Sequence, residues 1–214
     1  MDSQLLIRNE IVIMVFYLIW FLVIKYNLKI TYNKWNMVGL LCFGSIMNVI
    51  TVITGITPMS GFHLKIDIST ININLINGIG EMLNEGMFGV YNIVGNVLLF
   101  MPVGFLVPLI CNRYNSFLKV TLFGFLISLF VECWQLFLFR GSDVVDLFLN
   151  TLGTMLGYFI YCLCKKMFFR FVMKFSSEQY SLQKIEEAGT VFSAIVPIVI
   201  AISLGFLDRV IYGI

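Results

Sequence analysis

The chain has 214 residues, of which 59% are hydrophobic and 12% are charged, and its mean hydropathy is +0.94. A soluble domain carries about 25% charged residues, so this composition argues against a soluble protein and predicts a polytopic membrane protein. The formal net charge of +2 gives no indication of a nucleic-acid partner. The five cysteines form no C-x-x-C pair and His63 is the only histidine, which argues against a zinc site of the usual kind.

Six segments are apolar and long enough to form helices that span a bilayer, which takes about 20 residues each. They lie at residues 9–25, 37–56, 93–111, 119–139, 144–164 and 191–208. We therefore predict an all-α, polytopic integral membrane protein with six transmembrane helices, five of which form the core. Because a polar stretch separates the last helix from the others, we divide the chain into a transmembrane domain at 1–174 and a polar linker with an additional helix at 175–214.

The basic residues predict the orientation of these helices. The connections after the first, third and fifth helices carry three, two and five of the 14 Lys and Arg residues. Cytoplasmic connections of membrane proteins carry the excess of Lys and Arg, so we place these three in the cytoplasm. The N-terminus and residues 57–92 and 140–143 then lie outside.

The long outer connection contains two kinds of pattern. Residues 63–69 and 71–74 alternate apolar and polar side chains, as half-buried strands do. Residues 75–83, LINGIGEML, instead have the spacing of a short amphipathic helix. Such a helix would lie flat at the outer interface as a lid, or would be an ordered connector without a role of its own.

Polar residues in three of the predicted helices lie at one depth. Glu132 lies seven residues before the outer end of the helix at 119–139, about 10 Å below the surface at ~1.5 Å per residue. Asn150 lies at a similar depth in the next helix, and Asn96 lies about a turn into the helix at 93–111. We therefore expect these side chains to meet in the outer third of the membrane.

Helical periodicity places these polar residues on shared faces. At ~100° per residue, Asp146 and Asn150 fall in the same narrow arc of their helix as Gly153 and Gly157. The two glycines form a G-x-x-x-G pattern, which lets a neighbouring helix pack closely on that face. The polar face of this helix should therefore point into the protein.

The charged residues of this region are unbalanced. A charge inside the membrane costs about 2.5–3.5 kcal/mol even on the most lenient scale, so mutual pairing in a wet cavity is favoured. Arg140 is the one cation near three acids, Glu132, Asp143 and Asp146. Either one carboxyl stays protonated, or the cluster takes a divalent cation or the ammonium group of a ligand. A simple clamp between two helices is the alternative.

The polar and glycine residues of three helices form one sequence pattern, which consists of Gly95, Asn96, Phe100, Pro102, Gly104, Phe105, Glu132, Gln135, Arg140, Asp143, Asp146, Asn150, Gly153 and Gly157. This pattern resembles that of the VanZ-like family of bacterial membrane proteins. The resemblance covers the first five helices and leaves the sixth outside. It implies a multi-pass protein of the bacterial cell membrane with a role at the envelope. The founding members are associated with resistance to teicoplanin-type lipoglycopeptides.

Two functional hypotheses follow. The first is an outward-facing polar site that binds or acts on an envelope amphiphile, either a lipid-linked cell-wall intermediate or a lipoglycopeptide antibiotic. Arg140 would hold a phosphate or carboxylate. Glu132 and Asp146 would act as acid and base or hold a cation. The expected substrate-binding residues are Asn96, Gln135, Asp143 and Asn150.

The second hypothesis is a non-catalytic transporter or accessory scaffold. The chain has few helices and no inverted repeat, which argues against a self-contained transporter, although a homo-oligomer would remedy this. The sequence leaves open whether the protein is an enzyme. It predicts membrane lipid or a lipid-linked substrate as the partner.

Overall fold

The computed structural model describes residues 3–27, 33–56, 74–137, 144–175 and 180–212. Throughout these segments the secondary structure is helical, with no strand, which confirms the predicted all-α fold class. The segments for which we predicted strands, 63–69 and 71–74, lie outside the described residues except for Asn74. The Asn74 side chain accepts a hydrogen bond from the main-chain N–H of Asn77 and so caps the following helix.

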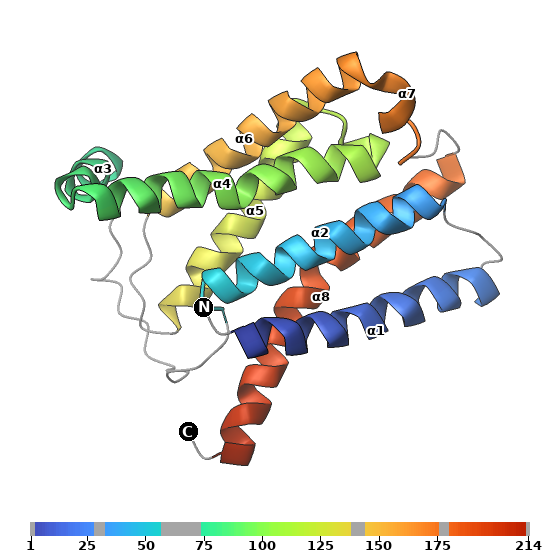
Figure 1. The fold of residues 1–214 in the computed structure, drawn as a ribbon, viewed down its shortest axis with the longest axis horizontal. Helices are drawn as coiled ribbons and strands as arrows, with labels where there is room; N and C mark the ends of the chain where they lie inside the picture. The colour runs from blue at the N-terminus through green and yellow to red at the C-terminus, as the bar shows by residue number, and fades with distance from the viewer. Residues whose placement is uncertain (1–2, 28–32, 57–73, 138–143, 176–179, 213–214) are drawn as a thin grey trace.

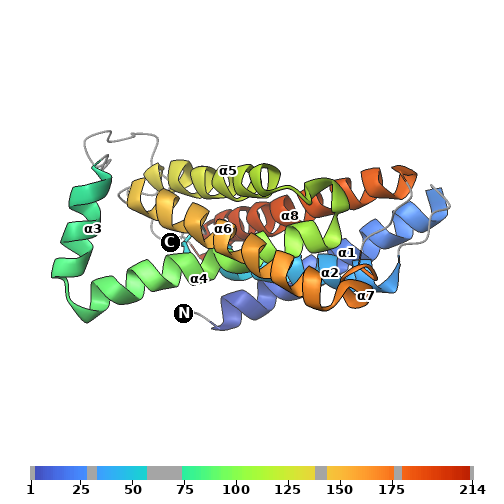
Figure 2. The same ribbon diagram turned by 90° about the horizontal axis from the view of Figure 1, so that it is seen from above.

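Among the described residues, six helices are long and apolar enough to cross a membrane, as the sequence predicted. The six are α1 Ser3–Asn27, α2 Lys34–Ile53, α4 Met87–Ile110, α5 Phe117–Leu136, α6 Val144–Met167 and α8 Tyr180–Tyr212. The shorter elements are α3 Leu75–Asn84, η2 Asn112–Tyr114 and α7 Phe169–Val172. Helices α1, α2, α4 and α6 lie roughly lengthwise beside one another, α5 and α8 run obliquely to them, and the short helix α3 lies across one end of the bundle (Figures 1 and 2).

Helices α4 and α6 are joined along a seam of glycines. A Cβ added to Gly153 or Gly157 of α6 would overlap a main-chain oxygen of α4, at Val97 and Met101 respectively. In the opposite direction, a Cβ on Gly104 of α4 would overlap a main-chain oxygen of α6. The G-x-x-x-G pattern therefore brings α6 against α4 with backbone contacting backbone, as its small residues predicted.

Helix α8 begins earlier than the sequence suggested, so residues 180–190, assigned to a polar linker, are helical. The reason is that the polar residues follow a helical period: Glu186 and Thr190 are buried on one face with Gly189 and Ser193. The hydroxyls of Thr190 and Ser193 each donate to a main-chain oxygen one turn back, so they need no water.

Helix α8 packs along α2 and also meets α1. Its residues Ala194, Ile198 and Ile200 are buried in the same hydrophobic core as residues of α1, α2, α4 and α5. The sixth helix therefore packs into the hydrophobic core that the first five helices form. The division of the chain at residue 174 stays a prediction.

Candidate functional site

A cavity of about 260 Å³ lies at the end of the bundle where α3 crosses it. Five of the seven residues predicted for the site line this cavity together. The other two, Arg140 and Asp143, lie outside the described residues. The lining residues are Ile53, Thr54, Met82, Asn92, Asn96, Glu132, Gln135, Asp146 and Asn150. Helices α4, α5 and α6 thus bring their polar groups to one place, as their common depth predicted.

Hydrogen bonds connect these polar residues between helices. Asn96 Nδ2 on α4 donates to Asp146 Oδ1 on α6 over 2.6 Å. Asn150 Nδ2 on α6 donates to Ser128 Oγ on α5 over 2.9 Å. The face of α6 that carries Asp146 and Asn150 therefore points into the protein.

Glu132 is the most enclosed acid of the cavity. Its residue is 5% exposed, although it carries a group that is costly to bury. It lies on α5 beside Ser128, one turn earlier, and both side chains are buried. A carboxyl group at this position faces protein and cavity rather than acyl chains, which is the environment that binding or proton transfer requires.

Two side chains of α5 fix the cavity wall to the end of α2. Gln135 Nε2 donates to the main-chain oxygen of Thr54 over 2.8 Å, and Trp134 Nε1 donates to that of Ile56 over 2.9 Å. Trp134 has the amphipathic ring typical of residues at the membrane interface, and it lies near the end of α5, where such a residue is expected. Its hydrogen bond also joins α5 to the residues that follow α2.

Helix α3 is the short helix that the sequence predicted, and it contributes Met82 to the cavity wall. The chain turns sharply into α4 at Gly86, whose φ of 67° is a conformation that glycine adopts without strain. Gly89 then packs so closely on α3 that a Cβ would overlap the main-chain oxygen of Met82. This packing holds α3 across the end of the bundle; its role as a lid stays a prediction.

Sequence reasoning missed a second polar cluster between α1 and α2, which we call the α1–α2 cluster. Glu10 on α1 accepts hydrogen bonds from Ser45 Oγ and, over 2.9 Å, from Asn48 Nδ2, both on α2. The predicted first helix, at residues 9–25, places Glu10 at its start, whereas α1 begins at Ser3. The spacing of Ser45 and Asn48, one turn apart on one face, was the available signal.

No cluster of three or more His, Cys, Asp and Glu able to hold a metal ion is found in the part of the chain that the structure describes. Glu132 and Asp146 line the same cavity, and Asp143 lies outside the described residues. A divalent cation held by Glu132, Asp143 and Asp146 therefore stays a prediction.

The helices and the cavity define a class: a multi-pass, all-α membrane protein in which carboxyl and amide groups of three spanning helices line one cavity. Within that class, the family model VanZ/LLP1 matches residues 11–165, which run from α1 to the last turn of α6. The chain belongs to the VanZ/LLP1 family, as its sequence pattern indicated. No curated protein and no solved structure matches the chain. Helix α8 lies beyond the matched residues.

Proposed function

We propose that the cavity binds the polar head of an envelope amphiphile that enters from the outer leaflet. The ligand class is a lipid-linked cell-wall intermediate or a lipoglycopeptide of the teicoplanin type, which would link this chain to antibiotic resistance. The observation that carries this proposal is the shared cavity lined by Asn96, Glu132, Gln135, Asp146 and Asn150. Polar groups inside a membrane are costly, and a binding site is one reason to keep several of them together.

The geometry supports a division of roles. Glu132 and Asp146 are the general acid and base, or together hold a cationic group of the ligand. Asn96, Gln135 and Asn150 orient the ligand, because their side chains are held between helices. Arg140 and Asp143, outside the described residues, would complete the site with a guanidinium for a phosphate or carboxylate.

An outward-facing cavity in a bacterial cell membrane is part of this proposal. The cavity lies at the end of the bundle that holds the start of α6, whereas Lys165 and Lys166 lie in the last turn of that helix. A pair of cysteine substitutions tests the orientation in a variant without its native cysteines. We expect Glu85→Cys, exposed beside the cavity, to react with an impermeant maleimide in intact cells. Lys166→Cys should react only after permeabilisation; the reverse result would contradict an outward site.

The test of binding uses Glu132→Gln in the full-length protein in lipid nanodiscs. The probes are teicoplanin and undecaprenyl phosphate. We expect Glu132→Gln to weaken binding of at least one probe about tenfold or more, because a carboxylate that contacts a ligand contributes at least 1.4 kcal/mol. Thermal unfolding shows whether the variant remains folded, and binding is compared at a temperature at which both proteins are folded.

Glu85→Gln is the matched control, since it removes the same charge from an exposed position. Its binding should equal that of the wild type. Wild-type protein that binds neither probe, or equal binding by Glu132→Gln, would contradict the proposal.

An accessory scaffold is the second candidate function, and one observation favours it. The amides of Asn96, Gln135 and Asn150 each join two different helices, which is what a structural clamp does. In a scaffold, Glu132→Gln would keep the cellular phenotype as long as the protein remains folded in the membrane. Measured teicoplanin susceptibility of a host expressing each variant therefore separates the two functions.

A further inference from the structure

A groove of about 700 Å³ lies between α1, η2 and the first half of α8. It is separate from the polar cavity, with which it shares no residue. Its volume is in the range of pockets that hold small ligands. The lining residues are Trp20, Arg113, Lys184, Glu187, Ala188, Val191, Phe192, Ile195 and Val196.

The groove is polar at one end and apolar along the rest. Lys184 and Glu187 lie near the start of α8, and the lining positions from Val191 to Val196 are apolar. From Lys184 to Val196 the helix rises about 18 Å at ~1.5 Å per residue, roughly the depth of one bilayer leaflet. The groove therefore has the polarity and length of one lipid molecule.

Trp20 forms the wall of the groove on α1. Its ring stacks on that of Phe192, with 4.4 Å between the ring centroids and 19° between the planes. Its Nε1 is buried and has no hydrogen-bond partner among the described residues. The pair of rings offers an apolar surface for an acyl chain.

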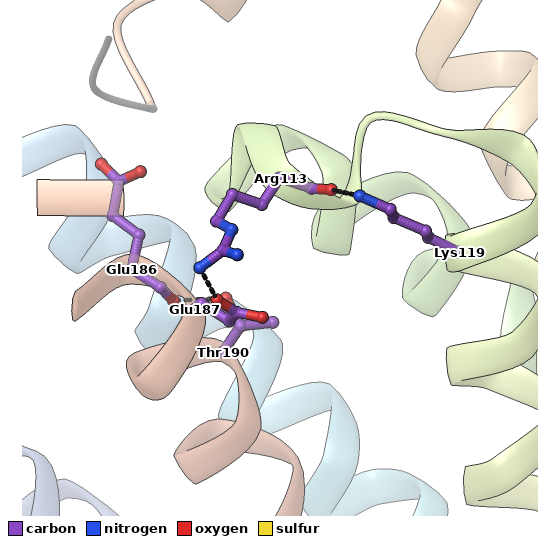
Figure 3. A network of polar contacts seen from close by, with 5 residues as sticks. All are labelled: Arg113, Lys119, Glu186, Glu187 and Thr190. Carbon is purple, nitrogen blue, oxygen red and sulfur yellow. Dashed lines mark hydrogen bonds and ion pairs between the residues drawn. The ribbon is translucent and has the colours of Figure 1, made fainter. Parts of the chain in front are cut away.

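The polar end of the groove favours an anion. Arg113 pairs with Glu187 through Nη1, and the side chain of Glu186 points away from the guanidinium (Figure 3). Lys184 also lines the groove and adds a second positive charge. Lys119 Nζ lies on the other side of Arg113, where it donates to the main-chain oxygen over 3.0 Å (Figure 3). A guanidinium carries five N–H donors, so Arg113 retains donors beyond the one that Glu187 uses.

We propose that this groove binds one anionic phospholipid of the leaflet at this end of the bundle. The phosphate lies at Arg113 and Lys184, and one acyl chain lies along Trp20 and the apolar side of α8. Basic pockets between membrane helices are known to hold anionic lipid headgroups. Because α1 and η2 belong to the family-matched residues and α8 does not, the lipid joins α8 to the matched part of the chain. This inference does not depend on the proposed function.

Quenching of Trp20 fluorescence tests the proposal. The full-length protein is placed in phosphatidylcholine vesicles that contain increasing fractions of a lipid with a brominated acyl chain. The lipid is either phosphatidylglycerol or phosphatidylcholine, and the signal of a Trp20→Phe variant is subtracted. We expect half-maximal quenching at an about tenfold lower fraction of phosphatidylglycerol, because two basic side chains hold its phosphate.

Two variants and one control make the test specific. Arg113→Gln combined with Lys184→Gln should remove the preference for phosphatidylglycerol. The control, Lys166→Gln with Arg170→Gln, removes two charges from exposed positions on α6 and α7 and should retain the preference. Ala188→Phe fills the groove without altering a charge, so it should lower quenching by phosphatidylglycerol to the level of phosphatidylcholine even if the double variant is unstable.

Equal quenching by the two lipids in the wild type would overturn the proposal. So would a preference that survives Ala188→Phe, or one that the Lys166 and Arg170 control also loses. Absence of quenching by either lipid, accompanied by cross-linked dimers, would assign the groove to a second copy of the chain instead.

Discussion

Two polar clusters in the spanning helices are built from the same chemistry and differ in what surrounds them. In the cavity, Asp146 accepts an amide hydrogen from Asn96 over 2.6 Å; in the α1–α2 cluster, Glu10 accepts one from Asn48 over 2.9 Å. Both carboxylate oxygens of Glu10 accept hydrogen bonds from a single helix, α2, whereas Asp146 lies in a cavity that six other residues with polar side chains also line. A carboxylate within the membrane is therefore not by itself a sign of a site. A carboxylate that borders a cavity can bind a ligand, whereas one without a cavity beside it only joins two helices.

The α4–α6 seam supports the cavity, and breaking it should have the largest effect. Gly153→Leu places a side chain against the main-chain oxygen of Val97, which cannot move aside as a side chain would. Overpacking of a side chain costs about 1–3 kcal/mol, and contact with backbone should cost more. We expect a fall in Tm of about 10 °C or more together with loss of ligand binding, measured by thermal unfolding in detergent.

Gly95→Leu is the control for this prediction, because a Cβ at Gly95 of α4 meets nothing within 4 Å. Its Tm should stay close to that of the wild type although Gly95 belongs to the family pattern. Equal losses in both variants would mean that the seam is not what holds α4 against α6.

Substitution of Glu10 and of Glu132 by glutamine should have different effects on ligand binding, which distinguishes the two clusters. Glu10→Gln replaces one acceptor oxygen by a donor, so the bond from Ser45 or from Asn48 is lost. The loss of a hydrogen bond to a buried group should lower the free energy of unfolding by about 1–3 kcal/mol. Binding by the protein that remains folded should be unchanged, in contrast to Glu132→Gln. Denaturant titration and the teicoplanin binding assay measure the two effects, and weaker binding by Glu10→Gln would make the α1–α2 cluster part of the site.

Replacing the asparagine donor of each cluster by alanine should lower the free energy of unfolding by different amounts. The difference between the two variants should be smaller than the effects above. Asn48 is fully buried, so Asn48→Ala leaves Glu10 with a lost partner that water cannot easily replace. Asn96 lines the cavity, where water can take its place beside Asp146. We expect Asn48→Ala to cost about 1 kcal/mol more than Asn96→Ala in the free energy of unfolding. Equal costs would indicate that the cavity excludes water.

The cavity was more predictable from sequence than the α1–α2 cluster for a physical reason. Glu132 and Asn150 each lie about seven residues inside an apolar segment, so their cost is visible in the sequence and their depth follows from helix geometry. Asp146 lies in the first turn of its helix but shares a face with Asn150. Glu10 lies near the expected end of its segment, where a charge is cheap. Only the observation that α1 begins at Ser3 places Glu10 inside the helix.

The sequence predicted that the last helix starts at residue 191, whereas α8 begins at Tyr180. A stretch with Lys184, Glu186 and Glu187 has the composition of a linker, but its buried face is formed by small and polar residues that bond within the helix. Hydropathy therefore hides this face, whereas helical periodicity would have indicated it. The helix on which α8 mainly packs is α2. This pairing depends on residues far apart in the sequence, so the local sequence pattern does not predict it.

The ion pair between Arg8 on α1 and Asp208 on α8 should have the smallest effect. Arg8 Nη1 lies 2.8 Å from Asp208 Oδ1 and 2.9 Å from Oδ2, but the two side chains are 39% and 30% exposed. Solvent screens a pair of this kind, so a double-mutant cycle with Arg8→Gln and Asp208→Asn should give a coupling of about 0.5–1 kcal/mol. The coupling should decrease with added salt, because exposed charges are screened by ions. A coupling of several kcal/mol that salt leaves unchanged would instead mean that Arg8 and Asp208 are shielded from water in the membrane. Their ion pair would then stabilise the fold as strongly as the hydrogen bonds of Glu10.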